Sequence, residues 1–99
     1  MSVRKEVTDF VALGHLPEEA NADAQKIALH QAYLEKIARP VTADEAALLM
    51  SAFGPDDCYG LAWTLLHLIE STPGGVPLTQ RPSESGNEWL RRLWDRSHR

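Results

Sequence analysis

The chain has 99 residues, of which 43% are hydrophobic and 24% charged, and its formal net charge is −4. This length suits one globular domain with a single core, and the longest nearly apolar stretch, residues 58–69, is shorter than the roughly 20 residues of a transmembrane helix. A single cysteine excludes an internal disulfide and a multi-cysteine zinc site. The first ten residues contain no apolar signal segment. Because of both features we expect a cytoplasmic protein.

Apolar residues recur at helical spacing almost throughout the chain, and no stretch alternates in the manner of a β-strand. Five helices are predicted in chain order, at about residues 2–13, 18–38, 43–53, 55–71 and 87–96. The first is expected to end at Gly14 in a left-handed conformation, and the second to begin after Pro17. The third opens with a capping-box sequence that runs from Thr42 to Glu45.

The third and fourth predicted helices meet at Gly54 and Pro55. Pro55 suits the first position of a helix, so we expect Gly54 to adopt a positive φ angle and to form a tight helical hairpin. The core of this hairpin is predicted to contain Leu49, Phe53, Leu61, Leu65 and Leu68. Residues 72–86 hold three prolines and three glycines and are predicted to form a long loop. The predicted fold is an all-α domain over residues 1–99, a small bundle of four to five helices.

Charge is unevenly distributed along the chain. Residues 1–80 contain eleven acidic and five basic side chains, net −6, whereas residues 81–99 are net +2. An acidic body disfavours nucleic acid, whose phosphates reward clusters of lysine and arginine, and it favours a basic protein partner. Trp89, Trp94 and the arginines around them form an aromatic and basic sequence, but the two tryptophans are better explained as packing anchors.

Four carboxylates flank the predicted hairpin and are the candidate partner-binding residues: Asp44, Glu45, Asp56 and Asp57. Near helix starts, such groups also stabilise the helix dipole and the free backbone amides, which is the simpler explanation of the Asp56–Asp57 pair. No second acidic motif accompanies them, and the four histidines are not paired at metal-binding spacing. We therefore expect no catalytic residue, no metal and no cofactor.

One face of the fourth predicted helix is small and polar, and it contains Gly60, Thr64, His67 and Ser71. Either a neighbouring helix packs closely over it, or it is an open binding face. A ligand-binding or catalytic pocket lined by Trp63, His67 and Glu70 is the alternative to partner binding. Cys58 lies nine residues from His67 on the predicted helix, about 13 Å along its axis, and therefore cannot serve as a nucleophile beside it.

Residues 47–74, ALLMSAFGPDDCYGLAWTLLHLIESTPG, resemble the helical hairpin of small all-helical, HEAT-like bacterial proteins, some of which are thought to be immunity partners of polymorphic toxins. The similarity rests on the GPDD turn and the GLAWTLLHLIE helix and covers under a third of the chain. It implies binding and not catalysis, and it transfers no functional residue. We interpret the chain as a non-enzymatic protein-binding module with an immunity- or antitoxin-like role against a basic partner; the alternative is a small helical ligand-binding protein or enzyme.

Overall fold

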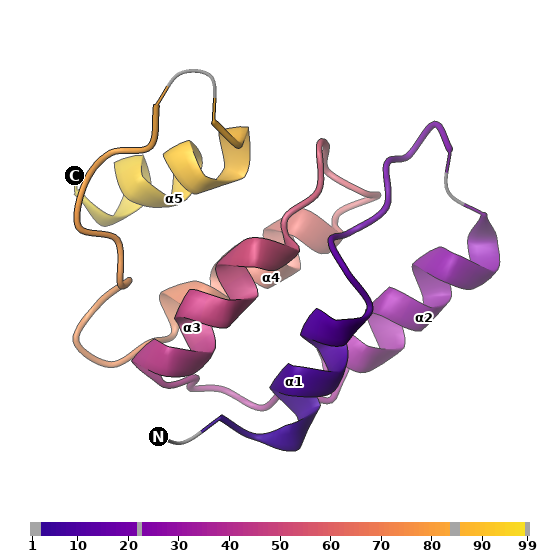
Figure 1. The fold of residues 1–99 in the computed structure, drawn as a ribbon, viewed down its shortest axis with the longest axis horizontal. Helices are drawn as coiled ribbons and strands as arrows, with labels where there is room; N and C mark the ends of the chain where they lie inside the picture. Colours follow the sequence, from indigo (N-terminus) through magenta and orange to yellow (C-terminus); the bar gives the residue numbers. More distant parts are fainter. Residues whose placement is uncertain (1–2, 22, 84–85, 99) are drawn as a thin grey trace.

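The computed structural model describes residues 3–21, 23–83 and 86–98. It is a small all-α bundle whose helices, in chain order, are α1 (Lys5–Ala12), α2 (Ala24–Glu35), α3 (Ala43–Leu49), α4 (Leu61–Glu70) and α5 (Glu88–Ser97). A short 3₁₀ turn, Met50–Ala52, continues α3. Helix α5 lies on the opposite side of the molecule from α2, at the end of a long connection (Figure 1). The described residues form no β-strand, and the predicted all-α fold is confirmed.

Two predicted helices begin later than expected. Helix α2 does not begin after Pro17; it begins at Ala24, because the Asp23 side chain caps it by accepting a hydrogen bond from the amide of Lys26 at 2.7 Å. Residues 18–21 form a turn instead. Helix α4 begins at Leu61, where residues 55–71 were expected to be helical, because three consecutive residues before it have left-handed backbone angles: Cys58, Tyr59 and Gly60, with φ of 46°, 52° and 91°.

The two glycine predictions have different outcomes. Gly14 has a φ of 89°, as expected at the end of α1. The positive φ expected at Gly54 is wrong, because the left-handed residues lie further along the same loop. Gly54 is needed for space instead: a Cβ atom there would lie 2.1 Å from the carbonyl oxygen of Leu16. The chain that follows α1 therefore passes directly against the loop between α3 and α4.

Helices α3 and α4 form the antiparallel hairpin at the centre of the core. Ser71, just after α4, accepts a hydrogen bond at its hydroxyl from the amide of Val41, just before α3, at 3.3 Å. All five predicted core residues are buried: Leu49, Phe53, Leu61, Leu65 and Leu68. Helix α1 adds Val7 and Phe10, which are fully buried. Burial of one such side chain contributes about 1.5–3 kcal/mol, so these contacts are the main stabilising term of the fold.

Helix α5 is anchored to the hairpin by aromatic stacking, by a hydrogen bond from Asn87 and by the ion pair between Arg96 and Glu70. Asn87 caps it, since its Oδ1 accepts from the amide of Trp89 at 2.8 Å while its Nδ2 donates to the Gly54 carbonyl at 3.1 Å. The Trp89 ring stacks on Phe53, with centroids 6.1 Å apart. The predicted 72–86 loop has no helix or strand in its described part, 72–83 and 86; residues 84 and 85, like residue 2 of the first predicted helix, lie outside the described chain.

Candidate functional site

Glu45 does not lie on the surface, and its assignment as a partner-binding residue is corrected. Its side chain is fully buried and accepts hydrogen bonds at Oε2 from the Nε and the backbone amide of Arg4, both at 2.9 Å. The amide of Thr42 donates to Oε1, also at 2.9 Å, and completes the predicted capping box. The bond from the Arg4 guanidinium is the main reason why the pKa of Glu45 falls to about 2. Glu45 therefore joins the chain before α1 to the start of α3 and is not available to a partner.

The other three predicted carboxylates do not form one patch. Asp44 is exposed in the first turn of α3, whereas Asp56 and Asp57 lie in the loop beyond the opposite end of that helix. Helix α3 and the 3₁₀ turn together span ten residues, which separates the two positions by about 15 Å at a rise of roughly 1.5 Å per residue. Asp56 and Asp57 alone remain together as candidates for one binding surface.

The loop that carries Asp56 is clamped to the turn that follows α1. The Asp56 carboxylate accepts a hydrogen bond from the amide of Glu19 at 3.1 Å, and the Glu19 carboxylate accepts one from the amide of Tyr59 at 2.9 Å. Asp56 also accepts from the amide of Cys58 at 3.0 Å. Left-handed conformations at Cys58 and Tyr59 each cost on the order of 1 kcal/mol or more, and these bonds offset that cost. Tyr59 remains 66% exposed, and its hydroxyl lies 3.5 Å from the carbonyl oxygen of Glu19.

A pocket of about 270 Å³ opens beside this loop, between the loop and α5, and we call it the Trp63–Trp89 pocket. Its lining is Pro55, Asp56, Asp57, Trp63, Glu88, Trp89 and Arg92. The rings of Trp63 and Trp89 meet edge to face, with centroids 5.2 Å apart. Arg92 lies over both rings and bonds to Glu88 at 2.6 Å. Three carboxylates and one guanidinium thus line the pocket, which leaves it negatively charged.

The pocket predicted from Trp63, His67 and Glu70 does not assemble around those three residues. Only Trp63 lines the Trp63–Trp89 pocket. His67 is exposed, with its ring centroid 6.1 Å from that of Trp63, and Glu70 is held by Arg96 in two contacts of 2.7 and 3.0 Å. Burial, together with nearby carboxylates, raises the pKa of the Cys58 thiol, which disfavours the reactive thiolate form.

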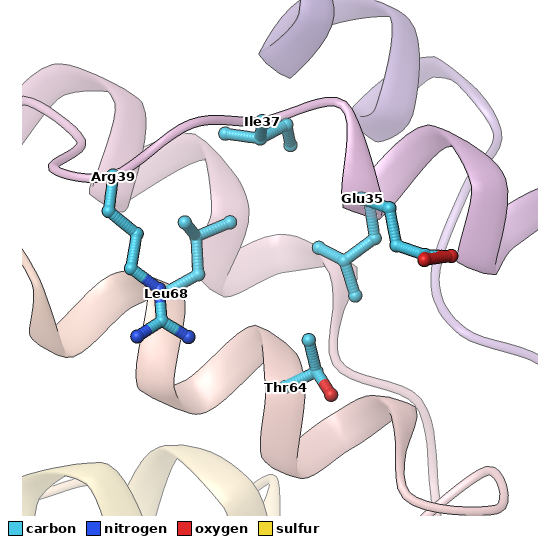
Figure 2. Close-up of a pocket in the computed structure, with 6 residues that line it drawn as sticks. Glu35, Ile37, Arg39, Thr64 and Leu68 are labelled. Atoms are coloured by element: carbon cyan, nitrogen blue, oxygen red, sulfur yellow. The ribbon is translucent and has the colours of Figure 1, made fainter.

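The small polar face of α4 is open rather than covered by a helix. A Cβ atom added at Gly60 would meet nothing within 4 Å, and Thr64 is exposed, with its hydroxyl 3.4 Å from the Gly60 carbonyl oxygen. A second depression, of about 300 Å³, lies between this face and the end of α2 (Figure 2). Its lining is Leu34, Glu35, Ile37, Arg39, Thr64 and Leu68.

This second depression offers little to a ligand. Its three apolar residues, Leu34, Ile37 and Leu68, are only 3–6% exposed. Trp89 is equally buried, but its pocket also contains the partly exposed ring of Trp63, whereas no aromatic ring of the described residues lines this depression. The Glu35 carboxylate and the Arg39 guanidinium point to opposite sides of it (Figure 2). Binding pockets are usually lined by accessible apolar surface with convergent polar groups, and this depression has neither.

Within residues 3–21, 23–83 and 86–98, no group of three or more His, Cys, Asp or Glu side chains is arranged to hold a metal ion. None of the helices in the described chain combines the length and apolar character that a membrane span requires.

Several residues of the site were not singled out as binding residues from the sequence, among them Glu19, Glu88 and Trp89. Glu19 meets Asp56 across 37 positions of the chain, and Glu88 and Trp89 reach the pocket only because α5 folds back onto α4. Local spacing carries no signal for such contacts. The acidic residues of the site come from three separate segments, so the cluster of charge around the predicted hairpin revealed Asp56 and Asp57 but not Glu19 or Glu88.

Comparisons with protein-family models, with curated proteins and with solved structures found no match to this chain. They therefore neither support nor oppose the resemblance of residues 47–74 to helical immunity proteins.

Proposed function

We propose that this chain is a non-enzymatic module that binds a basic segment of a partner protein. The binding surface, which we call the acidic–aromatic surface, comprises Glu19, Asp56, Asp57, Tyr59 and the Trp63–Trp89 pocket. The observation that carries the proposal is the pocket itself, where two indole rings and three carboxylates share a lining with a single guanidinium.

Three physical properties support this use of the surface. Tryptophan and tyrosine are enriched among the residues that dominate binding energy at protein interfaces. The reciprocal bonds between Glu19 and the Asp56–Tyr59 loop hold the surface in place before binding, which lowers the entropic cost of association. The net charge of −6 on residues 1–80 attracts a cationic partner and speeds its approach.

An immunity- or antitoxin-like role is the concrete form of the proposal. In that role the acidic–aromatic surface covers the cationic site of a bacterial, nuclease-like toxin and so blocks its access to nucleic acid. The proposal places this interaction in the cytoplasm, since the one cysteine, Cys58, is buried and unpaired and a reducing compartment preserves free thiols.

The proposal is tested with two short peptides of equal length, one with lysines and arginines in a Gly–Ser frame and one with glutamates in their place. Titration calorimetry measures their affinities for the wild-type protein, Asp57→Asn and Asp44→Asn. The two variants remove the same charge, and both Asp57 and Asp44 lie close to the start of a helix, so Asp44→Asn is the matched control. Thermal melts establish that each variant is folded.

We expect the basic peptide to bind and the acidic peptide not to bind. Asp57→Asn is expected to weaken binding about two- to fivefold, the usual value of one partly exposed ion pair, and Asp44→Asn to have a much smaller effect. The difference in affinity between the wild type and Asp57→Asn should shrink as the salt concentration passes about 0.15 M, where the Debye length is near 8 Å. Equal weakening by the two variants would show that binding follows net charge and would contradict this location, and failure of the basic peptide to bind would contradict the proposal itself.

A further inference from the structure

We infer that the Trp63–Trp89 pocket receives an arginine side chain of the partner, in competition with the chain's own Arg92. This inference rests on the proposed function and specifies the group that is recognised. It follows from the position of Arg92, from the distribution of hydrogen bonds among the carboxylates of the pocket, and from the difference between guanidinium and ammonium groups.

The indole rings of the pocket already bind a guanidinium group. The Arg92 Cζ atom lies 4.7 Å from the centroid of Trp89 and 5.2 Å from that of Trp63, within the range of a cation–π contact. The Arg92 side chain is nevertheless 39% exposed. Arg92 is therefore able to leave the rings toward solvent while the rest of α5 stays in place.

The carboxylates of the pocket differ in how far their hydrogen-bonding capacity is used. Asp56 accepts from the amides of Glu19 and Cys58, and Glu88 is paired with Arg92. Asp57 has a buried Oδ1 atom that accepts no hydrogen bond from the described residues. Asp57 is therefore the pocket carboxylate with an unused acceptor atom among the described residues, and it lies in the same pocket as the two indole rings.

An arginine side chain suits this combination better than a lysine side chain. A guanidinium group is planar and weakly hydrated, so it stacks on an indole ring while its N–H groups bond to a carboxylate. An ammonium group is compact and strongly hydrated and gains less from the ring. An anionic group is repelled by Asp56, Asp57 and Glu88.

The test uses three peptides that differ only at one central position, which holds arginine, lysine or citrulline in a Gly–Ser frame with flanking lysines. Citrulline keeps the shape of arginine but replaces the guanidinium with a neutral urea. Calorimetry measures the affinities, and two-dimensional NMR follows the indole N–H resonances of Trp63 and Trp89. The proteins compared are the wild type, Asp57→Asn, Arg92→Gln and the control Asp44→Asn.

The arginine peptide is expected to bind about two- to fivefold more tightly than the lysine peptide, the factor that a cation–π contact at a partly exposed site contributes, and to shift both indole resonances. Asp57→Asn should reduce this preference, because the stacked guanidinium then loses its carboxylate acceptor while the rings remain, and Asp44→Asn should retain it. Arg92→Gln should increase the affinity of the arginine peptide, because it removes the guanidinium that lies over both rings. The Arg96 guanidinium, 6.0 Å from the centroid of Trp63, stays in place in this variant.

Different results separate the inference from the proposed function. Equal affinities of the arginine, lysine and citrulline peptides, or an arginine preference that is undiminished in Asp57→Asn, would overturn the inference while leaving an acidic binding surface. Weaker binding of the arginine peptide by a folded Arg92→Gln variant would overturn the competition with Arg92. Failure of every basic peptide to bind would overturn the inference and the proposed function together.

Discussion

The replacement Glu45→Gln tests the buried ion pair that joins the chain before α1 to α3. Gln has nearly the same shape and still accepts a hydrogen bond from the amide of Thr42, but it carries no charge opposite Arg4. The pKa of Glu45 falls from 4.5 to about 2 in the folded state, which corresponds to about 3 kcal/mol at 1.36 kcal/mol per unit. Because the Arg4 side chain is 39% exposed and solvent weakens the pair, we expect a loss of about 2–3 kcal/mol at pH 7.

The pH dependence of this loss distinguishes the ion pair from packing. Since the folded pKa is lowered, the stabilisation is present above pH 4.5 and is lost as pH falls toward about 2. Urea denaturation followed by tryptophan fluorescence measures the free energy of unfolding. The wild type should exceed Glu45→Gln in this free energy about half as much at pH 3 as at pH 7. The control Glu35→Gln removes an exposed carboxylate on α2 and should change the free energy of unfolding little at either pH. An equal loss from Glu45→Gln at both pH values would refute the reasoning.

Four further substitutions test the fold by urea denaturation. Leu65→Ala should cost about 2–5 kcal/mol, the usual range for a fully buried leucine, and a loss below about 0.5 kcal/mol would place α4 at the surface. Gly54→Ala should lower the free energy of unfolding more than Gly14→Ala, because its Cβ would lie 2.1 Å from the carbonyl oxygen of Leu16, whereas a Cβ at Gly14 would have open space around it. The reverse order would contradict the close approach of Gly54 to Leu16. His30→Leu should reduce the loss of stability as pH falls below 6.5, because burial lowers the pKa of His30 in the folded state and the unfolded chain takes up the proton first; an unchanged pH profile would contradict this.

Features set by local spacing were predictable from the sequence. The period of apolar residues in α3 and α4 identified Leu49, Leu61 and Leu65 as core, because a helical stripe must face the interior wherever the helix packs. The Thr42–Glu45 capping box was also predicted, since both of its hydrogen bonds link residues three positions apart. These elements need no information from distant parts of the chain.

Features set by long-range contacts were not predictable in the same way. Local signals placed the start of α4 at Pro55, but Cys58 and Tyr59 are left-handed in a loop that is clamped by Glu19, which lies 40 positions before Tyr59. Glu45 has the sequence signature of a surface carboxylate in the first turn of a helix. Its burial depends on Arg4, which lies 41 positions earlier.

The candidate site depended on the geometry of the hairpin. Asp44 and Asp56 are twelve positions apart in the sequence, and the helix predicted over residues 43–53 lies between them, so its length already implied their separation. The antiparallel packing of α3 and α4 places them at opposite ends of the hairpin. The same packing leaves Asp56 beside Glu19 and close to the N-terminus of α5, which is the arrangement that the proposed function uses.

An NMR map of the basic arginine peptide on the ¹⁵N-labelled protein tests the central claim most directly. The proposed function predicts that the largest shifts, at stoichiometric saturation, fall on the amides of residues 55–60 and on the indole N–H groups of Trp63 and Trp89. It also predicts little change at Asp44, at the other end of α3, and at Glu35 and Arg39, which line the second depression and not the Trp63–Trp89 pocket. Shifts centred on that depression, or spread over all acidic residues without a maximum at the Trp63–Trp89 pocket, would contradict the acidic–aromatic surface as the binding site.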